Sequence, residues 1–195
     1  MKPGDDDTLL GLLASDLDRY YELLLQKYSG ILYSYIYHYI RNVPDTDDIM
    51  QDTSLRIYTA LRGYSEEQIS GMSDRLRPWL YKVAKSAYLT YIDKQRRFVS
   101  VSLDTESDAL LDEESGNDLP DQVLEREETR GEVAGLVAEL PEKYREVIYL
   151  HYFDEFKLFE IADILQEPEG TIRQKKRRAL ALLQKAINRE QKGVS

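Results

Sequence analysis

A run of cationic side chains near the C-terminus, within GTIRQKKRRALALLQKAI, is the clearest chemical signal in the sequence. Lys175, Lys176, Arg177 and Arg178 follow one another in a chain whose formal net charge is −10. Lysine and arginine bind phosphates, and arginine and glutamine also pair with the edges of guanine and adenine. The segment is therefore a candidate nucleic-acid reader, with a solvated basic helix face as the alternative.

A helical projection separates the apolar side chains of this segment from the charged ones. The apolar side carries Ile172, Ala179, Leu180, Leu182, Leu183, Ala186 and Ile187. The opposite side carries Arg173, Gln174, Arg177 and Arg178. Lys175 flanks the apolar side, and Lys176 falls within it. The position of Lys176 predicts that the start of the helix projects beyond its core.

Charge is distributed in blocks along the rest of the chain. Residues 75–97 hold seven Lys or Arg and one acidic residue, whereas residues 98–129 hold eleven Asp or Glu and a single Arg126. Because salt screens charges beyond about 10 Å, a basic patch binds phosphate even on an acidic protein. The acidic block is poor in aromatic residues, which predicts a flexible linker between two domains.

Apolar spacing predicts helices on both sides of this linker. Leu24, Tyr28, Ile31 and Tyr35 recur at nearly 3.6 residues, which favours a helix over the strand that alternating tyrosines at 33–39 also suggest. No segment shows strand alternation bounded by hairpin turns. We therefore predict an all-α fold of two small helical domains, joined by the acidic flexible linker.

Turn and capping residues predict where individual helices begin and end. Asp45, after Pro44, is the expected N-cap of a helix that ends near Gly63. Pro78 is expected in the first turn of a helix that reaches Tyr91.

The C-terminal domain has the pattern of a helix-turn-helix, since only QEPE separates KLFEIADIL from the basic helix. The predicted division of the chain is an acidic tail over 1–14, a first domain over 15–98, the linker over 99–121 and the helix-turn-helix domain over 122–191.

Other classes of protein have little support. The chain has no cysteine, and no apolar run approaches the roughly 20 residues that span a bilayer. Its N-terminus is acidic, unlike a signal peptide. His38 and His151 lie in apolar helical runs, and no nucleophile elbow, phosphate-binding glycine loop or HExxH motif occurs. We expect a cytoplasmic protein that is not an enzyme, with no cofactor, no metal and no membrane insertion.

Three segments in order resemble the extracytoplasmic-function (ECF) sigma factors of bacterial RNA polymerase, over nearly the whole chain. DTDDIMQDTSLRIYTAL is similar to the polymerase-binding helix of that family. RPWLYKVAKSAYLTYIDKQRR is similar to its promoter-melting helix, and LPEKYREVIYLHYFDEFKLFEIADILQEPEGTIRQKKRRAL to its helix-turn-helix domain.

The resemblance implies three sets of contacts. Those to polymerase are Asp45, Asp48, Ile49, Gln51, Asp52 and Leu55. Those to the single-stranded −10-type element are Arg75, Arg77, Trp79, Lys82, Lys85, Ser86 and Tyr88. Those to the duplex −35-type element are Thr171, Arg173, Gln174, Lys175, Arg177 and Arg178. Capping, a solvated face, and core roles for Ile49 or Leu55 are the alternatives for the first set. Trp79 is expected to be largely packed.

Three residues depart from the pattern that the family implies. Ser86 stands where Asn is frequent, Thr90 where Asp is frequent, and Gln166 where Gly is common in the turn. Gln166 must either adopt a left-handed conformation or change the geometry of the turn.

The implied function is that of a sigma factor, which binds core RNA polymerase, recognises both promoter elements and helps to melt DNA. The implied partners are core polymerase, promoter DNA and an anti-sigma factor, and we expect a monomer when the chain is free. Two alternatives stay open: a sigma-like decoy that sequesters an anti-sigma regulator, and a plain helix-turn-helix regulator. Three roles stay open for the linker: a nucleic-acid mimic, a segment that holds the two basic domains together before polymerase binds, or a solubilising tether.

Overall fold

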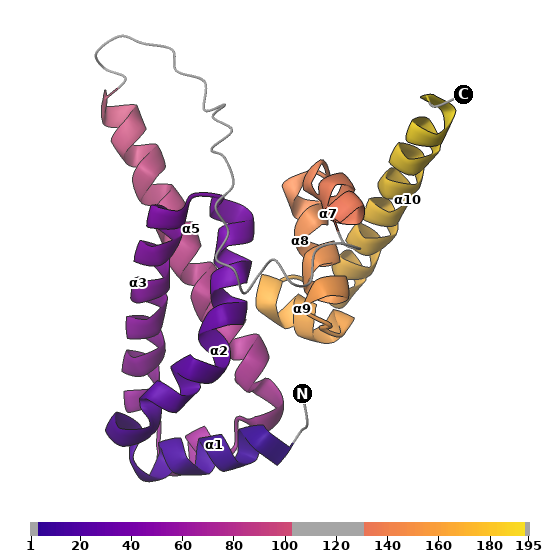
Figure 1. Cartoon of the computed structure of the whole chain (residues 1–195). Helices are drawn as coiled ribbons and strands as arrows, with labels where there is room; N and C mark the ends of the chain where they lie inside the picture. The colour runs from indigo at the N-terminus through magenta and orange to yellow at the C-terminus, as the bar shows by residue number, and fades with distance from the viewer. Residues whose placement is uncertain (1–3, 103–130, 194–195) are drawn as a thin grey trace. The chain divides into compact units, whose positions relative to one another are not determined.

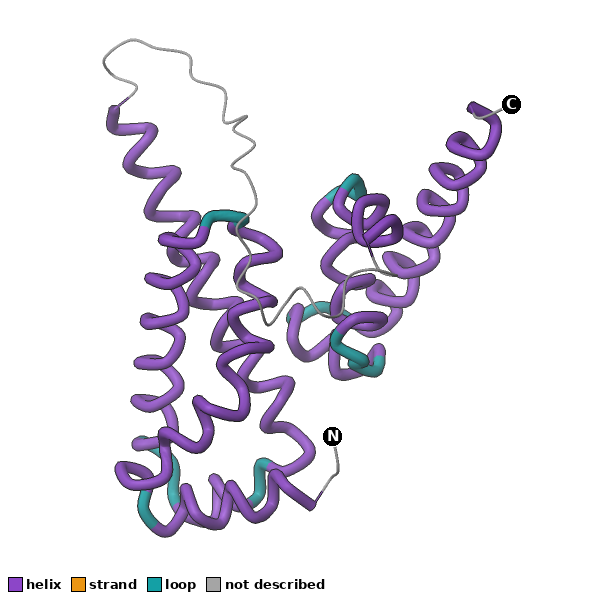
Figure 2. Tube along the Cα trace, in the orientation of Figure 1, coloured by secondary structure: helices purple, strands orange, loops and turns teal. Residues whose placement is uncertain are grey.

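The computed structural model describes residues 4–102 and 131–193, and within these ranges every regular element is a helix (Figures 1 and 2). This confirms the all-α fold. The chain divides into two compact units, Met1–Asn117 and Asp118–Ser195. The division falls inside the predicted linker, most of which lies outside the described residues. Residues 99–102, predicted as the start of the linker, continue a helix of the first unit.

The first unit is a helical bundle. Its elements are α1 (Gly4–Ser15), α2 (Leu17–Ile40), α3 (Val43–Arg62), α4 (Glu66–Ser70), the 3₁₀ turn η1 (Ser73–Arg75) and α5 (Leu76–Ser102). The long helices α2, α3 and α5 pack against one another, and α1 packs against α2 and α4 (Figure 1).

The segment predicted as an N-terminal tail is instead part of this bundle. Residues 4–15 form α1, in which Leu9, Leu10 and Leu13 are buried. The side chain of Lys27 pairs with Asp6 and ties α1 to α2. The acidic composition masked three leucines at helical spacing, and their burial makes the tail prediction wrong for residues 4–14.

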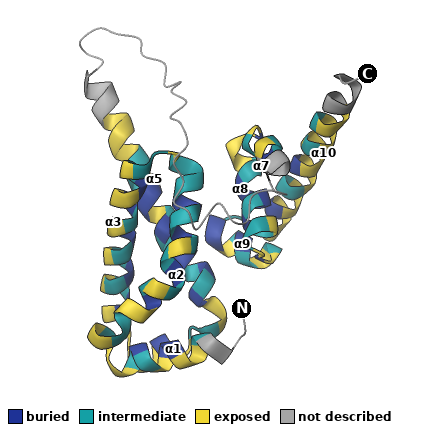
Figure 3. Cartoon of the chain, viewed as in Figure 1, coloured by how far each residue is buried: buried dark blue, intermediate teal, exposed yellow. Residues whose placement is uncertain are grey.

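Buried positions lie on both α2 and α5 (Figure 3), and tyrosines make up a large part of the core between these helices. Tyr35 is fully buried, and its ring centroid lies 4.8 Å from that of Tyr81 and 6.1 Å from that of Tyr88. Tyr39 stacks on Tyr88 at 4.9 Å with an interplanar angle of 6°. Helical spacing therefore prevails over the alternation of the tyrosines along the sequence.

Helix α3 begins earlier than the sequence predicts. Asn42, not Asp45, is the N-cap, and its side-chain oxygen accepts a hydrogen bond from the Asp45 N–H at 3.0 Å. Pro44 occupies the first turn, where a missing N–H costs nothing. The predicted end of α3 at Gly63 and the predicted place of Pro78 in the first turn of α5 are confirmed.

The second unit is a smaller helical domain. Its elements are α7 (Gly131–Ala138), α8 (Glu142–Ile148), the π-helical turn η2 (Tyr149–Phe153), α9 (Leu158–Leu165) and α10 (Glu169–Gly193). Val137, Leu140, Ile148 and Ala179 form one buried cluster that joins α7 and α8 to α10. The adjacent pair of α9 and α10 confirms the helix-turn-helix.

Candidate nucleic-acid interface

The turn between α9 and α10 sets the direction of the basic helix. Gln166 ends α9 in the left-handed region, with φ 58° and ψ 39°. The Glu167 N–H donates a hydrogen bond to the Ala162 carbonyl at 3.0 Å. This bond is typical of helix ends at which the left-handed residue is usually glycine. Of the two alternatives for Gln166, the structure shows the strained left-handed one.

The start of α10 presents most of the predicted duplex contacts to solvent. Ile172 and Ala179 are fully buried and fix the orientation of the helix against its domain. Five of the six predicted duplex contacts are exposed: Thr171, Arg173, Gln174, Arg177 and Arg178. This face can therefore offer arginine and glutamine donors to the groove of a duplex.

Two of the basic residues are paired with carboxylates next to the turn. Arg173 binds Glu169 at 2.7 Å, and its side chain remains 71% exposed. Lys175 binds Glu167 at 2.6 Å and is only 18% exposed. Arg173 is thus held by a weak surface pair, whereas Lys175 lies against the turn itself and is the least accessible member of its predicted set.

Lys176 has partners within its own domain, so its place on the apolar side does not require the start of α10 to project beyond the core, as the sequence predicts. Its Nζ lies 2.7 Å from Nε2 of His151 and 5.4 Å from the ring centroid of Tyr152. His151 Nδ1 lies 2.8 Å from the Phe156 carbonyl, so its N–H donates there and Nε2 accepts from Lys176. His151 of η2 thus supplies a polar partner for a lysine within the apolar side of α10.

Arg178 also has a contact within its domain. It hydrogen-bonds the phenol of Tyr144 on α8, and this bond lowers the pKa of that phenol below its usual value.

Further along α10, the predicted apolar side is only partly correct. Leu180, Leu182 and Ile187 are exposed.

The predicted −10 surface in the first unit is less open. Arg75 and Ser86 are exposed, whereas the other polar members and the indole are half-buried: Arg77, Trp79, Lys82 and Lys85. The Trp79 ring lies 6.1 Å from that of Tyr64, and this packing leaves the indole partly accessible.

Tyr88 is a correction to the predicted −10 set. It is 2% exposed and stacks on Tyr39, so it offers no ring to an unstacked base in this packing. The resemblance implied a contact of this ring with the single strand, but the tyrosines of α2 cover it. The role of Tyr88 is in the core.

The predicted polymerase-binding set is divided between surface and core. Asp48, Gln51 and Leu55 are exposed, and Leu55 shows 63% of its surface. Asp45 and Asp52 are half-buried. Ile49 is 2% exposed and is a core residue, as its alternative reading allowed, so its predicted contact is wrong for this packing.

Sequence reasoning missed two features of α3. Asp47, Met50, Gln51 and Ser54 line a shallow hollow on the exposed side of this helix. Arg56 reaches from α3 to Ser86 on α5, a contact between residues 30 positions apart. The spacing of polar residues along one side of α3 could have indicated the hollow. No pattern in the sequence indicates the contact between Arg56 and Ser86.

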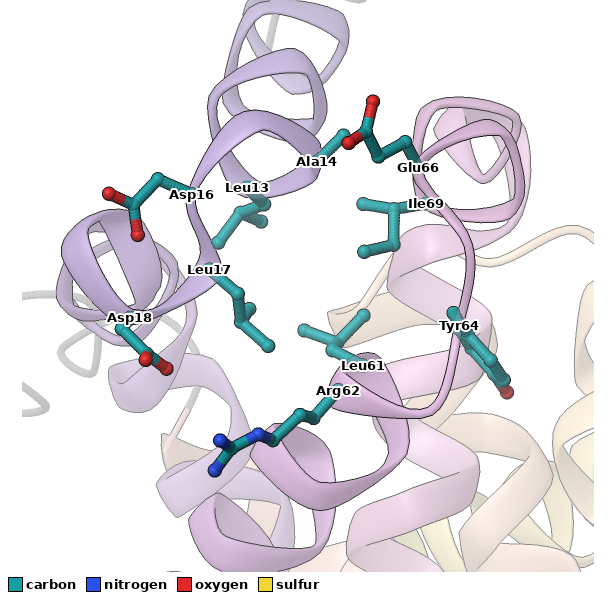
Figure 4. A pocket seen from close by; sticks show the side chains of 10 residues that line it. All are labelled: Leu13, Ala14, Asp16, Leu17, Asp18, Leu61, Arg62, Tyr64, Glu66 and Ile69. Atoms are coloured by element: carbon teal, nitrogen blue, oxygen red, sulfur yellow. The ribbon is translucent and has the colours of Figure 1, made fainter.

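A separate pocket of about 230 Å³ opens where α1, α2, α3 and α4 meet (Figure 4). Leu13, Leu61 and Ile69 form an apolar floor, and three carboxylates and one arginine surround it. The ring of charges comprises Asp16, Asp18, Glu66 and Arg62. A net negative rim repels phosphate, so this pocket is a poor place for a nucleotide.

Within residues 4–102 and 131–193, no group of three or more His, Cys, Asp or Glu is placed to hold a metal ion. No helix in these ranges is both long and apolar enough to cross a membrane.

Two family models match the chain in order: sigma-70 region 2 over residues 24–98, and sigma-70 region 4 over residues 130–183. The ECF RNA polymerase sigma factor SigM of Bacillus subtilis is 24% identical over 171 residues, which are 86% of this chain and 97% of that protein. SigW of the same organism is 25% identical over 191 residues, which are 96% and 92% of the two chains.

Two solved structures share the fold. CnrH, in complex with the cytosolic domain of CnrY, gives a TM-score of 0.60 at 19% identity, over 94% of this chain and 97% of that one. RpoE of Bartonella quintana, in complex with the anti-sigma factor NepR, gives a TM-score of 0.61 at 18% identity, over 86% and 96%. The two family models together cover more than half of the sequence, and the chain belongs to the sigma-70 family, in its ECF group of RNA polymerase sigma factors.

Proposed function

We propose that the chain acts in the bacterial cytoplasm as the promoter-specificity subunit of RNA polymerase. It binds core polymerase through the exposed side of α3. It reads a −35-type element with α10 and takes up the melted −10-type strand along α5. Catalysis of RNA synthesis then belongs to the polymerase.

One observation is the main support for this proposal: the basic, exposed start of α10 and the second basic helix, α5, lie in separate units. The two units match regions 4 and 2 of one family, respectively. A plain helix-turn-helix regulator has no need of the first unit. A decoy has no need of the exposed arginines of α10, Arg173 and Arg177.

Transcription in vitro tests the proposal. The purified chain is mixed with bacterial core polymerase on a fragmented genomic library, and the transcript starts are mapped. Starts that share two spaced upstream elements are expected. Binding to a regulator without any starts would favour the decoy, and absence of both starts and polymerase binding would refute the proposal.

We also propose that an anti-sigma protein binds this chain, because RpoE was solved with the anti-sigma factor NepR and CnrH with the cytosolic domain of CnrY. Affinity capture from the source bacterium under non-inducing conditions should recover a protein that abolishes the transcription described above. A captured protein that leaves transcription unchanged would count against this role.

A further inference from the structure

Arg56 joins two surfaces to which the family resemblance assigns different partners. Its Nε donates to Oδ2 of Asp52, on the same helix, at 2.9 Å. Its Nη1 donates to Oγ of Ser86, on α5, at 3.2 Å. Asp52 is a predicted polymerase contact, and Ser86 is a predicted contact to the single strand. Arg56 itself is in neither set.

The guanidinium has donors to spare for a ligand. Of its five N–H groups, the two hydrogen bonds described above use two. The Arg56 side chain is 32% exposed, and Ser86 beside it is exposed. Because Ser86 Oγ accepts from Arg56, its hydroxyl proton can point away from the protein.

Arg56 and Ser86 together therefore present hydrogen-bond donors. An asparagine at position 86 would instead offer one amide donor group and one carbonyl acceptor. A donor pair fits a ligand with two neighbouring acceptors, such as two phosphate oxygens or the O6 and N7 of guanine.

We propose that Arg56 is a DNA-binding residue of the −10 surface, held beside Ser86 by Asp52, and that it takes paired acceptors on the single strand. This inference rests on the proposed function, because it requires that the α5 surface meets melted DNA. A phosphate and a base edge share the acceptor chemistry, and the experiment below distinguishes them.

A purely structural role for the ion pair makes a different prediction. An exposed ion pair between residues i and i+4 contributes little to stability, and lysine can replace arginine in it. The bond to Ser86 depends on the forked shape of arginine. Arg56→Lys keeps the charge and loses the fork, and so separates the two roles.

The test uses the full chain assembled with saturating core polymerase. The probes are fluorescein-labelled single strands of about 12 nucleotides, in which each position in turn carries one of the four bases or an abasic site. We expect Arg56→Ala to weaken binding about tenfold and Arg56→Lys to restore only part of it. Arg62→Ala removes the same charge from the same helix and should stay within about twofold of wild type.

The part played by Asp52 is tested by combining variants. Asp52→Asn should weaken single-strand binding less than Arg56→Ala, and it should add nothing once Arg56 is already alanine. Full additivity of the two losses would show that Asp52 does not act through Arg56.

A loss that depends on the base at one position assigns a base edge, and a uniform loss assigns a phosphate. Binding of Arg56→Ala like wild type, or an equal loss in Arg62→Ala, would overturn the proposal.

Should Arg56→Ala melt more than about 3 °C below wild type, Arg56→Lys and Arg56→Gln decide by the same criteria. If the wild-type complex starts no transcripts, the proposed function fails; if it does and Arg56→Ala binds normally, only this inference fails.

Discussion

On α10 the predicted DNA contacts stand out from the helix, whereas on α5 most of them lie half-buried above a layer of tyrosines. Arg173 shows 71% of its side chain, and Tyr88 shows 2% of its surface. A duplex offers a groove that a protruding helix start can enter. A single strand needs a fixed surface against which its flexible backbone can be ordered.

The largest expected effect is a loss of stability when the tyrosine layer beneath α5 is disrupted. Tyr88→Ala should lower the free energy of unfolding of the first unit by about 3–5 kcal/mol, because it empties the space between α2 and α5. Ser86→Ala, two residues away and exposed, should change it by less than about 0.5 kcal/mol. Urea unfolding followed by far-ultraviolet circular dichroism measures both, and similar losses would mean that the tyrosine layer does not support α5.

The next largest expected effect is a loss of duplex binding when the exposed arginines of α10 are removed. Arg173→Ala combined with Arg177→Ala should weaken binding to a promoter duplex by roughly 2–4 kcal/mol, since each arginine can donate two bonds to a base or phosphate. Binding to core polymerase should not change. Fluorescence anisotropy at fixed salt measures the loss, with Lys185→Ala as an exposed control on the same helix. A double variant that binds the duplex normally would show that α10 does not read it.

The turn that aims α10 gives a smaller effect on stability. Gln166→Gly should stabilise the second unit by about 0.5–1 kcal/mol, because glycine adopts the left-handed conformation without strain. Thermal unfolding of the full chain followed by circular dichroism tests this, with Glu167→Gly as the control. Destabilisation by Gln166→Gly would mean that the glutamine side chain contributes more than its backbone strain costs.

The carboxylate beside Lys175 gives the smallest effect. Glu167→Gln should raise affinity for non-specific duplex about twofold at low salt, because it removes a negative charge next to a phosphate-binding cation. The gain should vanish at high salt, where surface charges are screened. A titration series at several salt concentrations measures it, and a gain that persists at high salt would point to a structural change instead.

The helices were predictable where spacing and turn residues agree. The periodicity from Leu24 to Tyr35 predicts α2, and the short QEPE connection predicts the helix-turn-helix. The cap at Asp45 was misplaced because Asn42 competes for the same role one turn earlier. The acidic N-terminal composition hid the apolar spacing of α1.

The candidate site was less predictable, because helical spacing alone does not say which side a neighbouring helix covers. Lys85 and Tyr88 lie one turn apart on α5, yet only Tyr88 is buried, since α2 packs there. Lys176 on the apolar side predicted a helix start that projects beyond its core, but His151 from η2 lies against this lysine. Arg56 escaped notice because its partner, Ser86, is distant in sequence.

The packing of Trp79 beside Tyr64 has a practical consequence for experiments on the chain without polymerase. Trp79 is the single tryptophan of the chain and lies on α5, 6.1 Å from the Tyr64 ring. Its intrinsic emission therefore comes from the first unit alone and can report unfolding there without a dye. Because the indole is half-buried next to the candidate single-strand surface, quenching by added oligonucleotide should follow occupancy of α5 while duplex binding by α10 leaves the signal unchanged.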